Sequence, residues 1–201
     1  MSGIFDISDR LALVTGSSRG LGRSLALALA DAGARVIVHG RDAAAVEDTR
    51  AQVEQRSGRP AHALTFDVTS PDEVMEFLGA AVGKYGVPDI LVNNAGIQRR
   101  APIQDFSVDD WDGIVAANLS SAFYVSRALL PHMVGRESGK IINIASVQSL
   151  LARQTIAPYS ATKGGRGPAH QGNGRRCRPF QHPGQCALAG LFRHGHEPCT
   201  R

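Results

Sequence analysis

The stretch LALVTGSSRGLG, residues 11–22, decides the fold that this chain is expected to adopt. Its first six residues form an apolar run typical of a buried strand, and a glycine-rich turn then leads into a helical pattern that ends at Gly33. Glycines let the backbone approach a phosphate, and a helix amino terminus adds free N–H groups and a positive dipole. The stretch therefore predicts a pyrophosphate site, with an unliganded tight turn as the alternative.

The same alternation of strand and helix continues as far as residue 146. Further strands are expected over 35–40, 61–68, 89–96 and 139–146, and helices over 43–58, 70–86 and 107–134. Apolar strands spaced by helices indicate parallel strands that are covered on both faces. With right-handed crossovers, the pattern predicts an α/β fold with a doubly wound parallel sheet of the Rossmann type.

Length and composition point to one domain of an ordinary globular protein. The chain has 201 residues, of which 43% are hydrophobic, enough for a sizeable core. No uninterrupted apolar run approaches the ~20 residues that span a bilayer. The amino terminus also lacks a signal-peptide pattern. We therefore expect a cytoplasmic protein with neither a membrane nor a nucleic acid as partner.

The chain changes character after Lys163. Residues 165–201 hold six Arg against one acid, Glu197, which makes this segment +5 and leaves −1 for the rest of the +4 chain. Glycines and Pro168 are expected to stop the helix that carries Lys163 after barely one turn. The sequence thus predicts a catalytic domain over 1–165 and an irregular basic tail over 166–201.

Three interpretations of the tail are open. Read one base out of step, residues 170–200 can encode a helix, an apolar strand and the loop SPGYFDT, which suggests a shifted reading frame after Gly165. Alternatively, the cysteines and histidines of the tail hold a metal, although their spacing matches no zinc pattern, and no metal is predicted. Alternatively, its arginines form a nucleic-acid arm.

The residues after the second strand indicate which dinucleotide would bind. An acidic residue there would grip the ribose 2′-OH of NAD, but the sequence reads GRD over 40–42. Arg41 can pair with a 2′-phosphate, and Arg19 of the glycine turn can join it. We therefore expect NADP(H), while Asp42 leaves NAD possible and a solvated Arg41 is the alternative.

Three residues near the end of the pattern suggest proton-transfer chemistry. Tyr159 and Lys163 are four residues apart and share one face of a helix, where the ammonium would lower the pKa of the phenol. Ser146 closes the fifth strand and is expected to face the ligand crevice at the carboxyl edge of the sheet. Taken singly, a Tyr and Lys at this spacing more often just share a helix face, and a Ser after a strand more often just forms a turn.

Together, these motifs resemble the short-chain dehydrogenase/reductase family. TGSSRGLG, NNAG at 93–96, Asn118, Ser146 and YSATK at 159–163 occur in the family's order and spacing, over residues 6 to about 165. The resemblance implies a catalytic set in which Tyr159 moves the proton, Ser146 orients the substrate oxygen, Lys163 holds the nicotinamide ribose and Asn118 fixes a relay water. It also implies a cofactor site formed by Thr15, Gly16, Ser18, Arg19, Gly20, Leu21, Gly22, Arg41, Asp67, Val68, Asn94, Ala95 and Gly96, together with Tyr159 and Lys163.

The loops around the crevice carry a hint about the substrate. Gln98, Arg99 and Arg100 follow the fourth strand, and Gln148 and Arg153 lie between Ser146 and Tyr159. Arginine pairs with carboxylates and glutamine with hydroxyls, which suits a polyhydroxylated acid. Both loops are similar to those of family members that interconvert gluconate and 5-keto-gluconate. We expect Ser146, Gln148, Arg100 and Arg153 to contact the substrate, with solvated arginines as the alternative.

The family pattern continues past Lys163 with a long helix and sixth and seventh strands that are not readable in this sequence. We therefore expect an incomplete sheet that ends at the fifth strand, whose apolar edge would lower solubility and impair turnover. A dinucleotide-binding remnant without catalysis, or a reductase for another small carbonyl compound, is the alternative. The dimer or tetramer that is typical of the family is doubtful for this chain.

Overall fold

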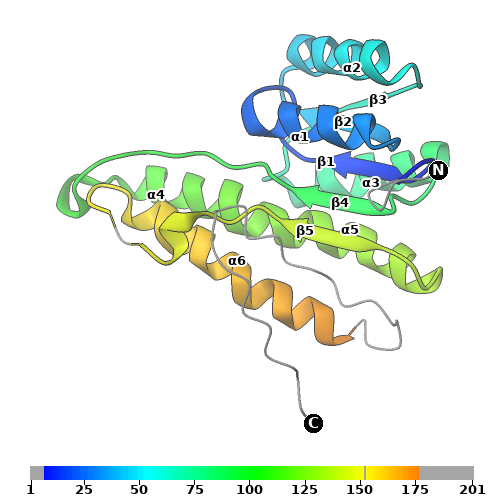
Figure 1. The fold of residues 1–201 in the computed structure, drawn as a ribbon. Coiled ribbons are helices and arrows are strands. Elements are labelled where there is room, and N and C mark those ends of the chain that lie inside the picture. The colour runs from blue at the N-terminus through cyan, green and yellow to red at the C-terminus, as the bar shows by residue number, and fades with distance from the viewer. Residues whose placement is uncertain (1–6, 152, 177–201) are drawn as a thin grey trace.

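The computed structural model describes residues 7–151 and 153–176 (Figure 1). Strands alternate with helices along the chain, and two short 3-10 turns and one π-helical turn interrupt the loops and helices. The strands are β1 (Leu11–Val14), β2 (Arg35–Gly40), β3 (His62–Thr65), β4 (Ile90–Asn93) and β5 (Lys140–Asn143). The helices are α1 (Gly20–Asp31), α2 (Ala43–Ser57), α3 (Pro71–Tyr85), η1 (Ile103–Asp105), α4 (Val108–Val115), η2 (Ala116–Ser120), α5 (Ser121–Gly135), η3 (Val147–Ser149) and α6 (Ala157–Arg176).

The strands form one parallel sheet in the order β3-β2-β1-β4-β5. Val14 is opposite Val38 of β2 and Val92 of β4, so all the carboxyl ends meet at one edge. This order confirms the doubly wound fold that the strand–helix alternation predicts. Within the described ranges the sheet has five strands and ends at β5, as expected for a sheet without the sixth and seventh strands.

Both faces of the sheet are covered, because consecutive residues of β1 point to opposite sides and all are buried. Leu11 and Leu13 belong to a core cluster with side chains of α3 and α5. Ala12 and Val14 belong to the other cluster, with side chains of α1 and α2. Figure 1 shows these two helix layers on either side of the strands. Uninterrupted apolar strands such as LALV therefore report burial on both faces.

Helices α4, η2 and α5 form one continuous helical stretch, Val108–Gly135. By length and composition alone, this stretch could cross a membrane, even though the sequence has no uninterrupted apolar run of that length. In this fold 44% of its most apolar window is buried, and Val125, Leu129 and Met133 pack into the core shared with α3. A core helix passes the same test as a membrane span, so the stretch carries no conclusion about a membrane.

Helix α6 is longer than the sequence predicts. The prediction that the helix carrying Lys163 stops after barely one turn was wrong. It runs from Ala157 to Arg176 and passes through Gly164, Gly165 and Pro168 without ending. A helix interior disfavours glycine by about 1 kcal/mol and proline by about 3 kcal/mol relative to alanine. Tertiary contacts oppose these costs: Gly165 lies against Leu119, and the Arg166 side chain is anchored in the core. Beyond Arg176, the cysteines of the predicted tail lie outside the described residues.

Candidate functional site

The glycine turn between β1 and α1 has the geometry of a phosphate cradle. Gly16 has a φ of 63°, and a Cβ added to Gly22 would lie 2.2 Å from the Gly16 carbonyl oxygen. Only glycine fits at both positions, because one needs the left-handed region and the other has no room for a side chain. Arg19 precedes α1 and gives it no side-chain cap, so the side chain at that position does not occupy the amino terminus of the helix.

Thr15 fixes this turn to the loop after β4. Its buried hydroxyl oxygen accepts hydrogen bonds from the main-chain N–H groups of Asn94 at 3.0 Å and Ala95 at 3.1 Å. The Asn94 side-chain amide donates in return to the carbonyl oxygens of Thr15 and Gly16. Thr15, which the sequence predicts as a cofactor residue, therefore holds the glycine turn and the loop after β4 together.

His39 of β2 contacts this turn, and sequence reasoning missed it. Its Nδ1 accepts from the Gly16 main-chain N–H at 3.1 Å, which leaves Nε2 to donate to the Phe66 carbonyl oxygen at 3.2 Å. Burial lowers the pKa of His39 to about 4, against the smaller opposing effects of the Phe66 hydrogen bond and the Asp67 charge. A neutral imidazole thus joins β2 to the phosphate turn.

A cavity of about 710 Å³ extends from this turn along the carboxyl edge of the sheet. It joins the helix amino terminus to the ends of β2, β3 and β4, which is the place where a doubly wound sheet binds a nucleotide. Of the predicted cofactor residues, Thr15, Gly20, Tyr159 and Lys163 do not line it. Those that do are Gly16, Ser18, Arg19, Leu21, Gly22, Arg41, Asp67, Val68, Asn94, Ala95 and Gly96.

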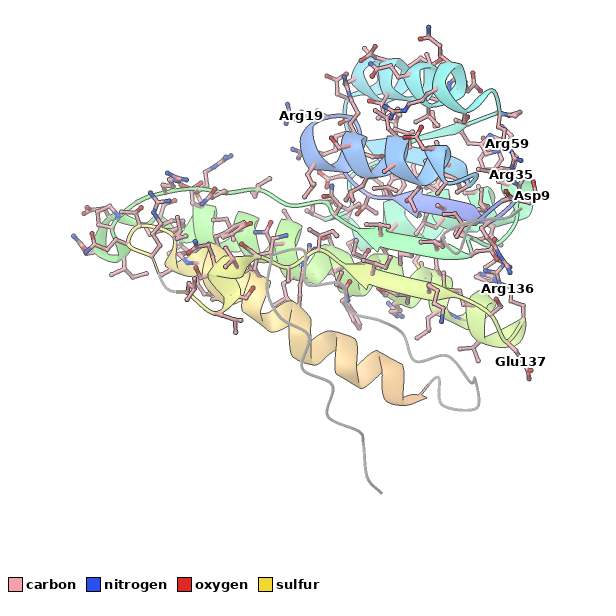
Figure 2. The ribbon with its side chains drawn as sticks, viewed as in Figure 1. Asp9, Arg19, Arg35, Arg59, Arg136 and Glu137 are labelled. Atoms are coloured by element: carbon pink, nitrogen blue, oxygen red, sulfur yellow. The ribbon has the colours of Figure 1, made fainter. Side chains whose placement is uncertain are left out.

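The charged groups of this cavity lie at the ends of β2 and β3. Arg41 pairs with Asp67, with Nη1 and Oδ2 3.3 Å apart, and its side chain is 67% exposed. Burial opposes ionisation of Asp67, but hydrogen bonds from Thr69 and the Arg41 guanidinium outweigh it and lower the pKa of Asp67. Arg19 is exposed at the start of α1 and extends away from the helix (Figure 2). An exposed pair of this kind is weak, so Arg41 can exchange Asp67 for a phosphate.

A second cavity, of about 360 Å³, contains three of the four predicted catalytic residues. Ser146, Tyr159 and Lys163 line it, together with Leu21 and Asn94, which also line the first cavity. Ser146 leaves the end of β5 in an extended conformation, and its Oγ accepts from the Gln148 N–H at 3.2 Å. The two cavities therefore form one crevice that ends at the tyrosine.

Lys163 is buried beside Tyr159. Its Nζ lies 5.8 Å from the centroid of the Tyr159 ring and donates to the Ile144 carbonyl oxygen at 2.8 Å. Burial, and after it the positive charge of Arg166, lowers the pKa of Lys163 to about 7. The spacing of four residues thus gives the shared helix face that the sequence predicts.

Asn118 lies in the π-helical turn η2, a local irregularity that often marks functional sites. Its side chain bonds both main-chain groups of Ile97, with Oδ1 accepting at 2.7 Å and Nδ2 donating at 2.9 Å, and Nδ2 also donates to the Thr162 hydroxyl. Both amide hydrogens are therefore engaged. Asn118 connects the loop after β4 to α6, and in this geometry its amide has no hydrogen to offer a relay water.

Most of this chain matches one known protein family. The sequence profile of the short chain dehydrogenase family matches residues 10–167. The chain belongs to the short-chain dehydrogenase family. Its relatives include the gluconate 5-dehydrogenase of Gluconobacter oxydans, 48% identical over 80% of this chain and 62% of the relative, and the 5-keto-D-gluconate 5-reductase of Escherichia coli K12, 40% identical over 82% and 64%.

A solved structure supports the same assignment. The gluconate 5-dehydrogenase of Burkholderia cenocepacia, in complex with NADP and tartrate, is 44% identical and superposes with a TM-score of 0.80 over 84% of this chain and 66% of that one. This chain spans less than two thirds of the length of the two curated relatives.

The fold brings the predicted substrate residues together only in part. Ser146 lines the catalytic cavity, and Gln98 joins it. Gln148 is half-buried, and its Oε1 has no hydrogen-bond partner among the described residues. Arg100 and Arg153 are exposed and line neither part of the crevice. Arg99 lines the nucleotide side and pairs with Asp110.

Arg166 is the second residue that sequence reasoning missed, because it was assigned to the tail. Its side chain is 1% exposed and lies against the carboxyl ends of β4 and β5. Only the long-range contacts of α6 reveal this position, since a single arginine after a glycine pair has no distinctive pattern.

Proposed function

We propose that this chain is an oxidoreductase that transfers hydride between NADP(H) and the secondary alcohol or ketone of a sugar acid such as gluconate or 5-keto-gluconate. The observation that carries the proposal is the continuous crevice from the glycine turn to Tyr159, in which nucleotide and catalytic residues share Leu21 and Asn94. The names of the relatives, which concern gluconate and 5-keto-D-gluconate, supply the substrate class.

The residues present fit a dinucleotide. The start of α1 carries no side-chain cap, and Gly22 has no room for a Cβ beside Gly16, which suits a pyrophosphate over the turn. Arg41 and Arg19 would face a 2′-phosphate, and the NADP complex of the Burkholderia relative supports this preference, while NAD stays possible. When bound, the nicotinamide supplies or accepts the hydride.

The protein side of the reaction is a proton transfer at Tyr159. In the reducing direction its hydroxyl would donate a proton to the substrate oxygen that Ser146 orients. Lys163, held by the Ile144 carbonyl, would bind the ribose and stabilise the phenolate that remains. Gln148 is held next to Ser146 through its main chain. Arg100 and Arg153 are exposed outside both cavities and would have to turn toward the crevice to reach the carboxylate.

The decisive experiment is NADPH oxidation with 5-keto-gluconate by the purified chain and by Tyr159→Phe. Y159F should lose turnover and keep NADPH affinity, because the ring stays and only the proton donor is removed. Tyr85→Phe, on α3, is the matched control. Measurable turnover that is equal in the chain and in Y159F would exclude Tyr159 as the proton donor.

The second candidate is a dinucleotide-binding protein without catalysis. It is favoured by the position of β5 at the edge of the described sheet and by the engagement of Asn118. A thermal shift with NADPH but no turnover on any of several ketones would support it. Turnover with another small carbonyl compound would instead support a different reductase.

Location and assembly are part of the proposal. We propose a cytoplasmic protein that binds neither nucleic acid nor membrane. The family resemblance implies a dimer or tetramer formed partly through the helix after Lys163 and the last strand of the sheet. Here α6 continues to Arg176, and the described ranges contain no strand after β5. Light scattering of the purified chain tests the assembly.

A further inference from the structure

We propose that Arg166 is a positioning residue of this site, which clamps the backbone around Asn118 and Ile144 and places a second buried cation next to Lys163. The proposal rests on the proposed dehydrogenase site for its functional meaning. It concerns a residue that lies outside the predicted catalytic set and touches neither substrate nor cofactor in any role assigned above.

The guanidinium joins three segments of the crevice. Its Nε donates to the carbonyl oxygen of Asn118 in η2 at 2.5 Å. Its Nη1 donates to the carbonyl oxygens of Asn93 at 2.7 Å and Ile144 at 3.0 Å, and its Nη2 donates to that of Ala95 at 2.9 Å. Asn93 and Ala95 lie at and just after the end of β4, Ile144 follows β5, and Asn118 lies within η2. One rigid fork therefore sets the spacing of the segments that carry Asn94, Ser146 and Asn118.

The buried charge of Arg166 is compensated by main-chain carbonyl groups and not by a carboxylate. Among the described residues, no Asp or Glu pairs with it, and its side chain is 1% exposed. Four carbonyl dipoles compensate the charge instead, in the way that a buried cation requires. Burial lowers the pKa of Arg166 to about 10, and the nearby Tyr159 opposes this effect, so the guanidinium stays charged near neutral pH.

Arg166 acts on Lys163 through a shared hydrogen-bond acceptor and through its positive charge. The Nζ of Lys163 shares the Ile144 carbonyl oxygen with Arg166, so one acceptor holds the two cations close together. Tyr159 and Arg166 are the ionisable groups of α6 near it. The segments around it contribute neutral groups such as Asn94, Asn118 and Ser146. Helix α4 also packs against α6, and its three carboxylates are on exposed residues: Asp109, Asp110 and Asp112. Arg166 therefore favours the neutral amine of Lys163 near neutral pH.

The test compares three variants of the whole chain. Arg166→Met removes the charge and the donors, and Arg166→Lys keeps the charge but loses the fork. Arg136→Met is the matched control, because Arg136 also donates to main-chain carbonyls, those of Val87 and Pro88, but at the far end of the sheet (Figure 2). Competitive acetylation followed by peptide mass spectrometry measures the titration midpoint of Lys163, with Lys84 and Lys140 as internal references. NADPH fluorescence measures the cofactor affinity.

The two functions of Arg166 have separate signatures. Removing a nearby positive charge favours the charged amine, so R166M should raise the Lys163 midpoint by about half a pH unit or more, while R166K and R136M leave it in place. R166M should also weaken NADPH binding by about tenfold relative to R136M, and R166K should restore part of it.

The contrary result is equally definite. An unchanged Lys163 midpoint in R166M, or a loss of affinity no larger than that of R136M, would overturn the proposal. If R166M lacks a cooperative thermal transition, Arg166→Gln takes its place under the same criteria. The Lys163 titration needs no turnover, so a chain that fails to bind NADPH refutes the proposed function while the charge effect is still measured.

Discussion

The Nδ1 atom of His39 accepts a hydrogen bond from the main-chain N–H of Gly16, 3.1 Å away, and so ties the phosphate turn to β2. Protonation of the buried ring would replace this acceptor with a donor. The folded state therefore holds His39 neutral, and burial keeps its pKa at about 4, below the ordinary 6.5.

The first prediction is a loss of stability in acid through His39. In the unfolded chain His39 binds a proton near pH 6.5, whereas the folded chain binds it only near pH 4, so stability is complete above the first value and falls toward the second. The loss is at most about 3 kcal/mol of unfolding free energy. Urea unfolding across this pH range measures it.

His39→Asn keeps an acceptor for Gly16 but removes the titrating group, and it should flatten the dependence on pH. His132→Gln, at an exposed position of α5, is the control and should keep the slope of the parent chain. If the unfolding free energy of H39N depends on pH as steeply as that of the parent chain, the acid sensitivity belongs to other groups.

Arg41 should determine the preference for NADP(H). Arg41→Ala should raise the Kd for NADPH about tenfold, because it removes a charge-assisted contact with the 2′-phosphate, and should leave NADH binding unchanged. Arg100→Ala, which removes an exposed arginine outside both cavities, is the control. Fluorescence titration with both cofactors measures the change. Equal affinity of R41A and the parent chain for NADPH would remove Arg41 from the cofactor site.

Gly22 should tolerate no side chain. In Gly22→Ala the new Cβ would lie 2.2 Å from the Gly16 carbonyl oxygen and 2.5 Å from the Asn94 amide nitrogen, so the turn must open. We expect a loss of about 1–3 kcal/mol in stability and about a tenfold loss of NADPH affinity. Gly79→Ala, in α3 with no atom within 4 Å of the added Cβ, should instead stabilise the chain by up to about 1 kcal/mol. Thermal unfolding that ranks the two variants the other way would contradict the tight packing of this turn.

The buried Lys163 should lower the unfolding free energy of the chain. Its pKa is lowered to about 7 from 10.5, mainly by burial, so folding opposes its charged form. Lys163→Met should therefore raise the unfolding free energy at neutral pH by about 1–2 kcal/mol while it abolishes turnover. The Ile144 carbonyl still accepts from Arg166 in this variant, so no buried acceptor is left unpaired. Lys84→Met, on the exposed face of α3, is the control, and a Tm of K163M below that of the parent would disprove the charge penalty.

The reading-frame hypothesis for the tail is decided by the nucleotide sequence. We expect the bases after the codon for Gly165, read one base on, to encode an apolar strand and the loop SPGYFDT. A chain produced in that frame should turn over 5-keto-gluconate faster than this one, because it would cover the edge of β5. Middle codon bases that spell neither the strand nor the loop would end the hypothesis.

The sequence by itself determined the features that depend on neighbours along the chain. The glycine turn, the apolar strands and the shared face of Tyr159 and Lys163 follow from local spacing, because a strand repeats every two residues and a helix every 3.6. These rules gave the parallel sheet, the crevice at its carboxyl edge and the positions of Ser146 and Tyr159.

Only the tertiary structure decided the rest. The bonds of His39 to Gly16 and Phe66 bridge 23 and 27 residues, and those of Arg166 bridge 22 to 73 residues. No local pattern encodes such contacts, and they outweigh local propensity. Gly164 and Gly165 favour an end to α6, yet the four carbonyls around Arg166 hold this turn of the helix in place, because buried hydrogen bonds to a charged group exceed the cost of a glycine in a helix.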